Sequence, residues 1–163
     1  METIIKTMQS STPSASVSAL EDHVGFWLRF VSNHVSGEFA RQVEQRGVSV
    51  SDWVAMREMY RHEQSGAAEL VSALGMTKGA VSKIVTRLQK KGLVARAPGV
   101  VDKRAQHLML TPAGRALVPE LAAIADRNDA SCFASLSVAQ RQSLMGMMQQ
   151  IVQDRQLRQV PTE

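Results

Sequence analysis

Cysteine is almost absent from the sequence, since Cys132 is the single one among 163 residues. One cysteine excludes an intramolecular disulfide and a cysteine-based metal site. Long apolar runs are also missing, because no stretch approaches the roughly 18 residues that a membrane-spanning helix needs. The first residues lack the apolar segment of a signal peptide. These absences predict a cytoplasmic protein.

The motifs of several common enzyme classes are missing as well. The sequence contains no G-x-x-x-x-G-K-[ST] phosphate loop, no H-E-x-x-H metal motif and no G-x-S-x-G nucleophile turn. Glu58 and His62 would share one face of a helix, and His34 is a conceivable third metal ligand. With four scattered histidines, a surface ion pair is the favoured interpretation. We expect neither an enzyme nor a bound cofactor or metal.

The overall composition is that of a single compact globular domain. Hydrophobic residues make up 44% of the chain and charged residues 21%, and the chain is long enough to bury a substantial core. Residues 9–16 are rich in serine and proline. Residues 1–16 are therefore expected to form a disordered N-terminal tail.

Positive charge is concentrated in one segment of the chain. Residues 78–104 carry eight lysines and arginines against one acid, whereas residues 1–77 carry six against nine and residues 105–163 carry five against five. The positive formal net charge of +4 therefore comes from residues 78–104. A concentrated positive field of this kind is expected for a protein that binds a polyanion.

Residues 70–90 have the pattern of two helices joined by a short turn. Gly75 is able to adopt the left-handed conformation that ends a helix, and Thr77 is a candidate N-cap for the next one. The turn formed by residues 75–77 has the length and glycine content of a helix-turn-helix motif. Apolar residues of the second helix repeat at i, i+3, i+4 and i+7 and must face a core: Val81, Ile84, Val85 and Leu88.

The opposite face of this second helix carries hydroxyl groups and long cations. At about 100° per residue, it presents Gly79, Ser82, Lys83, Thr86 and Lys90, with Lys78 and Arg87 at its flanks. Such side chains suit base edges and phosphates, and the missing side chain of Gly79 would let the backbone approach DNA closely. The alternative is an amphipathic surface helix whose lysines are merely solvated.

A basic hairpin follows this helix and favours DNA binding over a solvated surface. Residues 93–96 and 106–110 are two short apolar-rich runs, and the Pro98-Gly99 pair between them marks a turn. A basic hairpin directly after a basic second helix is typical of a wing. The sequence therefore predicts a winged helix-turn-helix fold that is mainly α with a small β wing.

Nearly the whole chain resembles the MarR family of bacterial transcriptional regulators. The most specific parts are GMTKGAVSKIVTRLQKKGLV, then Arg96, the triplet Asp102-Lys103-Arg104 and LMLTPAGR. The resemblance implies a homodimer on palindromic operators, with Arg104 in the minor groove and Asp102 orienting it. Lys103 joins the predicted DNA-binding residues. Oxidation-sensing relatives carry their cysteine in the first helix, so Cys132 is interpreted as a small buried residue of the fifth helix.

The segments on either side of the winged region are predicted to be helical. Apolar residues recur every three to four positions over 17–46, and Ser49 or Ser51 is placed to cap a second helix. Thr111 followed by Pro112 predicts the start of a helix to about residue 134, and a capping box at Ser137 predicts a last helix to about 159.

The first and last helices have more apolar periodicity than a small winged domain can cover. We therefore expect them to form an intermolecular helical interface, as the family resemblance also implies. The expected organisation is a disordered tail at 1–16, a helical dimerisation region at 17–48 and 111–160, and a winged helix-turn-helix DNA-binding region at 49–110.

A small-molecule site is implied only by the resemblance, which suggests an aromatic or phenolic anion held between the winged region and the dimerisation helices. Candidate lining residues are Trp27, Phe30, His34, Trp53, Met56, Arg57 and Arg96. Each aromatic among them is otherwise explained as ordinary core.

Two functions remain open. One is a homodimeric repressor of transcription that an effector releases from double-stranded DNA. The other is an antirepressor-like protein-interaction module that has a winged fold and reads no DNA. The predicted groove-facing charge favours the first.

Overall fold

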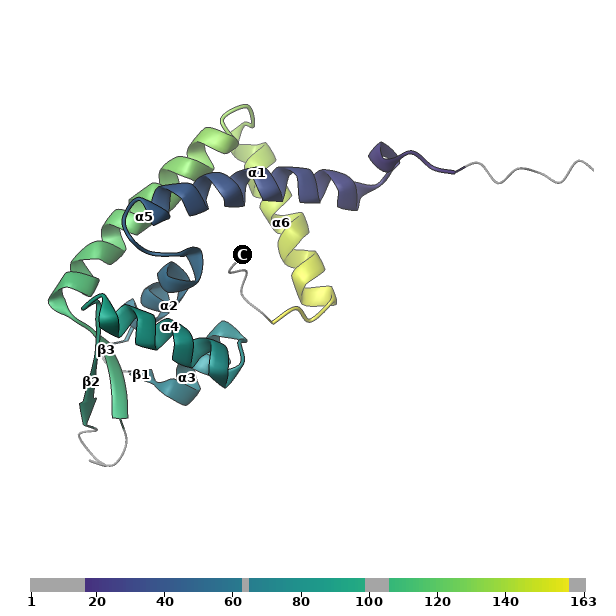
Figure 1. The fold of residues 1–163 in the computed structure, drawn as a ribbon. Helices are drawn as coiled ribbons and strands as arrows, with labels where there is room; N and C mark the ends of the chain where they lie inside the picture. The colour runs from purple at the N-terminus through teal and green to yellow at the C-terminus, as the bar shows by residue number, and fades with distance from the viewer. Residues whose placement is uncertain (1–16, 63–64, 99–105, 159–163) are drawn as a thin grey trace, which may run out of the picture.

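The computed structural model of the protein describes residues 17–62, 65–98 and 106–158. Within these residues a short 3-10 turn, six α-helices and a three-stranded sheet follow one another (Figure 1). The elements are η1 (Leu20–Asp22), α1 (Val24–Glu44), α2 (Val50–Tyr60), β1 (Ser65–Gly66), α3 (Ala67–Leu74), α4 (Lys78–Lys90), β2 (Val94–Pro98), β3 (Gln106–Leu110), α5 (Pro112–Cys132) and α6 (Val138–Asp154). The predicted mainly α fold with a small sheet is confirmed.

Polar caps begin four of these helices where the sequence predicts them. Ser49, Thr77, Thr111 and Ser137 each accept a hydrogen bond from a backbone N–H in the first turn of α2, α4, α5 and α6. Of the two serines proposed for α2, it is Ser49 that caps the helix. Pro112 occupies the first turn of α5, where its missing N–H costs nothing.

The start of the first long helix differs from the prediction. We expected a helix from residue 17, but α1 begins at Val24 behind the 3-10 turn. The Asp22 carboxylate accepts a hydrogen bond from the Ala19 N–H at 2.9 Å, and the Trp27 Nε1 donates to the Glu21 carbonyl at 2.9 Å. These local bonds compete with helical ones. At the other end of the chain α6 stops at Asp154, short of the predicted 159.

The sheet has the order β1-β3-β2 and is antiparallel throughout. Strands β2 and β3 form the predicted wing, with Val94 opposite Leu110 and Ala97 opposite His107. Strand β1 was not predicted, because its two residues are too short to show any alternation. It ties the start of α3 to the middle of β3.

One apolar core lies under the helix-turn-helix. The predicted stripe of α4 is buried, and it joins Ala55, Met56 and Met59 of α2 and Val118, Leu121 and Ile124 of α5. Burial of apolar surface is therefore what holds α4 against α2, α3 and β2.

Helices α1 and α5 pack side by side above this core, and α6 turns back from the end of α5 (Figure 1). No residue of α6 is buried. In the described part of the chain, no helix combines the length and apolar character that crossing a membrane requires.

Candidate nucleic-acid interface

The turn between α3 and α4 is built by two residues with different tasks. Gly75 has a φ of 62°, a left-handed conformation that glycine adopts without a Cβ clash, and it ends α3. The Thr77 hydroxyl accepts from the Ala80 N–H at 3.3 Å and starts α4. The predicted helix-turn-helix geometry is present, and it fixes which face of α4 points outward.

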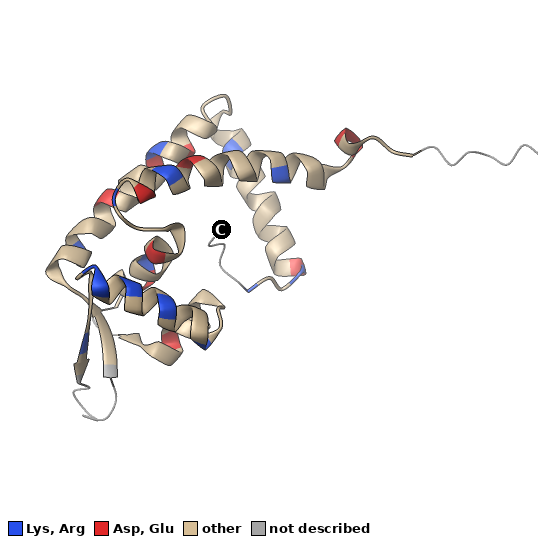
Figure 2. Cartoon of the chain, in the orientation of Figure 1, with Lys and Arg blue, Asp and Glu red and all other residues tan. Residues whose placement is uncertain are grey.

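That outward face of α4 carries the predicted polar set. Figure 2 shows basic residues on successive turns of the helix. Six of the predicted positions are exposed: Lys78, Gly79, Ser82, Lys83, Thr86 and Lys90. The centre of this face forms a shallow concavity lined by Ser82, Lys83, Thr86, Arg87 and Lys90. Cations and hydroxyls on one exposed helix suit phosphate and base-edge contacts.

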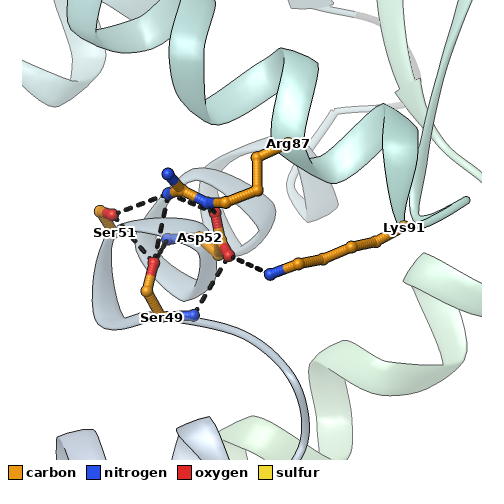
Figure 3. Close-up of polar contacts among 5 residues, drawn as sticks. All are labelled: Ser49, Ser51, Asp52, Arg87 and Lys91. Atoms are coloured by element: carbon orange, nitrogen blue, oxygen red, sulfur yellow. Dashed lines mark hydrogen bonds and ion pairs between the residues drawn. The ribbon is translucent and has the colours of Figure 1, made fainter.

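Arg87 occupies a different place from the other six. Its Nε donates to the Asp52 Oδ1 at 2.8 Å, and its Nη2 lies 3.2 Å from the Ser51 hydroxyl and 3.3 Å from that of Ser49 (Figure 3). The Lys91 Nζ donates to the other oxygen of Asp52 at 2.9 Å. Two cations at the end of α4 are therefore directed toward α2.

Asp52 is the hub of these contacts and has no exposed surface. Its carboxylate also accepts from the Ser49 N–H at 3.1 Å, which completes a capping box at the start of α2. Burial raises the pKa of Asp52, but hydrogen bonds from Arg87, Lys91 and the Ser49 N–H outweigh it, so the pKa lies below its ordinary value. The group is a carboxylate at neutral pH.

Sequence reasoning missed Asp52. The only local signal is its position three residues after Ser49, which indicates a helix cap and nothing more. Its partner Arg87 is 35 residues away, and the periodicity of α4 places Arg87 at a flank without saying what it faces.

None of the predicted DNA-contacting residues of the wing lies in the described part of the chain, which does include Arg96, a candidate effector residue. Arg96 lies exposed on β2, and with Lys78 it lines a pocket whose walls include Val71, Val81 and Leu108. Asp102, Lys103 and Arg104 lie outside the described residues, so their predicted role in DNA binding stays a prediction.

The candidate effector residues lie in different surroundings. Trp53 packs edge-on against Phe39 and lines a groove between α1 and α2, whereas His34 lines a second pocket with Arg127 and Cys132. Met56 is buried in the core. The four others are exposed: Trp27 and Phe30 on α1, Arg57 on α2 and Arg96 on β2.

The three candidate metal ligands do not lie together in the described part of the chain. His62 Nε2 lies 3.9 Å from a Glu58 carboxylate oxygen, which is the predicted surface ion pair, and His34 lines a different pocket. No group of three or more potential ligands gathers in the described part of the chain. Cys132 is half-buried at the end of α5, rather than fully buried as expected.

Comparisons with known proteins agree with this architecture. Residues 46–105 match the model of the MarR family. The HTH-type transcriptional repressor Rv2887 of Mycobacterium tuberculosis is 25% identical over 131 residues, which cover 80% of this chain and 94% of that protein.

Two solved structures are similar in fold. One is BpsR of Bordetella bronchiseptica, described with the regulation of its DNA binding by 6-hydroxynicotinic acid (TM-score 0.72, 22% identity, 83% of this chain and 97% of that one). The other is a mutant MarR from E. coli complexed with operator DNA (TM-score 0.71, 18% identity, 79% and 93%).

Proposed function

The chain belongs to the MarR family of transcriptional regulators, and from this premise we propose that it is a homodimeric repressor of transcription. It binds an inverted-repeat operator in double-stranded DNA and is released by a small-molecule effector. The observation that carries the proposal is the exposed face of α4, which bears cations and hydroxyl groups. The Thr77 cap and the buried apolar stripe hold this helix so that the polar face points to solvent.

The contacts to DNA divide between α4 and the wing. Ser82, Lys83 and Thr86 stand at the centre of the exposed face and read base edges in the major groove. Lys78 and Lys90 lie toward the ends of α4 and meet phosphates. Arg104 of the wing enters the minor groove with Asp102 orienting it, a role that rests on the family resemblance.

A second copy of the chain covers the apolar surface that one copy leaves open. Large hydrophobic side chains are exposed on two helices, namely Val24, Trp27, Leu28, Phe30 and Val31 on α1 and Met145, Met147, Met148, Ile151 and Val152 on α6. An apolar surface of this extent marks a protein–protein interface. Pairing it across a two-fold axis sets the recognition helices about 34 Å apart, so the half-sites are centred about 10 base pairs apart.

An aromatic anion is the effector class that the similarity to BpsR supports. Trp53 offers a flat apolar wall in the groove between α1 and α2, and Ser49 and Ser51 line the same groove with hydroxyl groups. The chain has two tryptophans, so a Trp27→Phe variant leaves Trp53 as the only one. Quenching of its fluorescence by 6-hydroxynicotinic acid supports this site, and an unchanged spectrum speaks against it.

Selection of bound sequences from random duplex DNA tests the main proposal. The expected result is enrichment of an inverted repeat, with an affinity whose logarithm falls linearly with the logarithm of salt concentration by about 0.9 per phosphate neutralised. The control is Asp126→Asn, which changes one exposed charge on α5 away from α4. No enrichment together with no gel shift at low salt rejects the repressor and favours the protein-interaction alternative.

A further inference from the structure

Recognition helix α4 is held at two separate places. Its apolar stripe packs on the core along the whole helix, and its last turn is tied to the first turn of α2 through Asp52. The second attachment is polar, because Arg87 and Lys91 both bind the carboxylate of Asp52, which is buried. An apolar contact is non-directional, whereas a hydrogen-bonded ion pair fixes an orientation.

From this arrangement we propose that Asp52 is a positioning residue that sets the sequence specificity of DNA binding. The proposal rests on the proposed function, since it assigns to Asp52 the orientation of the helix that reads bases. Asp52 faces away from the exposed face of α4 and acts on DNA only through Arg87 and Lys91 (Figure 3).

The attachment also continues toward the helix that carries exposed apolar surface. Trp53, the residue after Asp52, packs edge-on against Phe39 of α1 with ring centroids 6.4 Å apart. Asp52 and Trp53 therefore link α4 to α1 through the first turn of α2. If α1 forms part of the dimer interface, this link sets where each recognition helix stands relative to its partner.

The ion pairs have a second consequence for the charge near DNA. Asp52 pairs with two partly exposed cations of the basic segment, Arg87 and Lys91. The cations of α4 that Asp52 does not bind are Lys78, Lys83 and Lys90. The Asp52→Asn substitution keeps the shape of the side chain but removes its negative charge, so Arg87 and Lys91 lose the anion that they bind. Positive charge near the DNA then increases at the same time as α4 loses its fixed orientation.

The increase in positive charge and the loss of a fixed orientation of α4 affect operator and non-operator DNA differently. Binding to any duplex depends mainly on charge, and binding to the operator depends also on the alignment of side chains with base edges. The Asp52→Asn variant is therefore expected to bind non-operator DNA at least as tightly as the wild type, and the operator more weakly. Loss of folding would instead weaken binding to both.

The experiment measures the dissociation constants of the wild type and Asp52→Asn for the selected operator and for a scrambled duplex of equal length. The expected result is that the ratio of the two affinities falls by about tenfold. Asp126→Asn, with the same change in charge, keeps the wild-type ratio. An unchanged ratio in Asp52→Asn overturns the proposal, and a wild type without preference for any duplex overturns the proposed function instead.

A second variant decides the matter if Asp52→Asn does not fold. Lys91→Met keeps the aliphatic stem and leaves Arg87 on Asp52, so it removes one of the two ties. Its affinity ratio for operator over scrambled duplex is expected to fall below that of the wild type, and an unchanged ratio rejects the proposal. Operators whose half-sites are moved by one base pair add a readout of orientation, because the loosened variants are expected to discriminate less between the spacings.

Discussion

Gly114 in the first turn of α5 lies directly against the backbone of Leu93, so that a Cβ on Gly114 would come within 2.1 Å of the Leu93 carbonyl oxygen. The neighbouring Thr111 hydroxyl donates to the Gly92 carbonyl at 2.7 Å, and the Thr111 N–H donates to Leu93 at 3.0 Å. The start of α5 and the start of the wing are thus joined backbone to backbone, with no room for a side chain.

Gly114→Ala is expected to destabilise the protein by about 1–3 kcal/mol, because the obstructing atom belongs to the backbone and cannot rotate away. Gly37→Ala is the matched control, since a Cβ on Gly37 in the middle of α1 meets nothing within 4 Å. That control should stabilise the helix by up to about 1 kcal/mol. Urea unfolding measures both, and equal stability of Gly114→Ala and the wild type would show that the two backbones are not packed this closely.

The elements that the sequence predicted well are those with local signals. The turn at Gly75 and the caps at Thr77, Thr111 and Ser137 were all predicted from residue types within three or four positions of one another. The buried stripe of α4 was likewise predicted from helical periodicity. A helix cap and an apolar stripe depend on residues within one or two helical turns, so both can be recognised from the local sequence.

The features that escaped prediction depend on contacts between distant segments. Asp52 gains its importance from Arg87 and Lys91, on a helix that begins after an intervening helix and turn. The candidate effector residues Trp53 and His34 were grouped by residue type, and the fold places them in different pockets. No periodicity carries such information.

The depressed pKa of Asp52 predicts how stability responds to acid. An aspartate in the unfolded chain titrates near pH 3.9, and the folded-state pKa of Asp52 is lower. Its contribution to the free energy of unfolding is therefore complete above that pH and is lost as the pH falls through the folded value. The melting temperature of the wild type should fall more steeply between about pH 5 and 2 than that of Asp52→Asn. Parallel curves for the two proteins would contradict the ion-paired state.

The proposed dimer predicts that the last helix is needed for association. Deleting residues 137–163 should give monomers at micromolar concentration by analytical ultracentrifugation. The Ile151→Glu variant tests the same interface with a smaller change, because Ile151 is 50% exposed in one copy of the chain. It should also give monomers. Gln150→Glu is the control, because at about 100° per residue it lies opposite the stripe of Met148 and Val152. A truncated chain that remains dimeric places the interface elsewhere.

Substitutions in the recognition helix and in the wing should have different effects on DNA affinity and sequence preference. Lys83→Ala is expected to alter base preference, since a good base contact contributes about 1–3 kcal/mol of discrimination. Arg104→Ala should weaken binding strongly and change specificity only toward the A·T content of the flanks, with Asp102→Ala as a milder form. Lys90→Ala should weaken binding to every duplex alike. Binding to the operator and its single-base variants separates these patterns, and wild-type affinity of Arg104→Ala would remove the wing from the DNA contacts.

Gly79 gives the most direct test of how closely α4 approaches DNA. It lies exposed in the first turn of α4, and a Cβ there meets nothing within 4 Å in the protein itself. Gly79→Ala therefore leaves the fold intact, and any effect on DNA binding comes from the new methyl group at the interface. We expect weaker operator binding with unchanged thermal stability or a small gain, while Gly37→Ala binds as the wild type does. If Gly79→Ala binds the operator normally, the first turn of α4 does not come into backbone contact with DNA, and the base-reading contacts lie further along the helix, around Lys83 and Thr86.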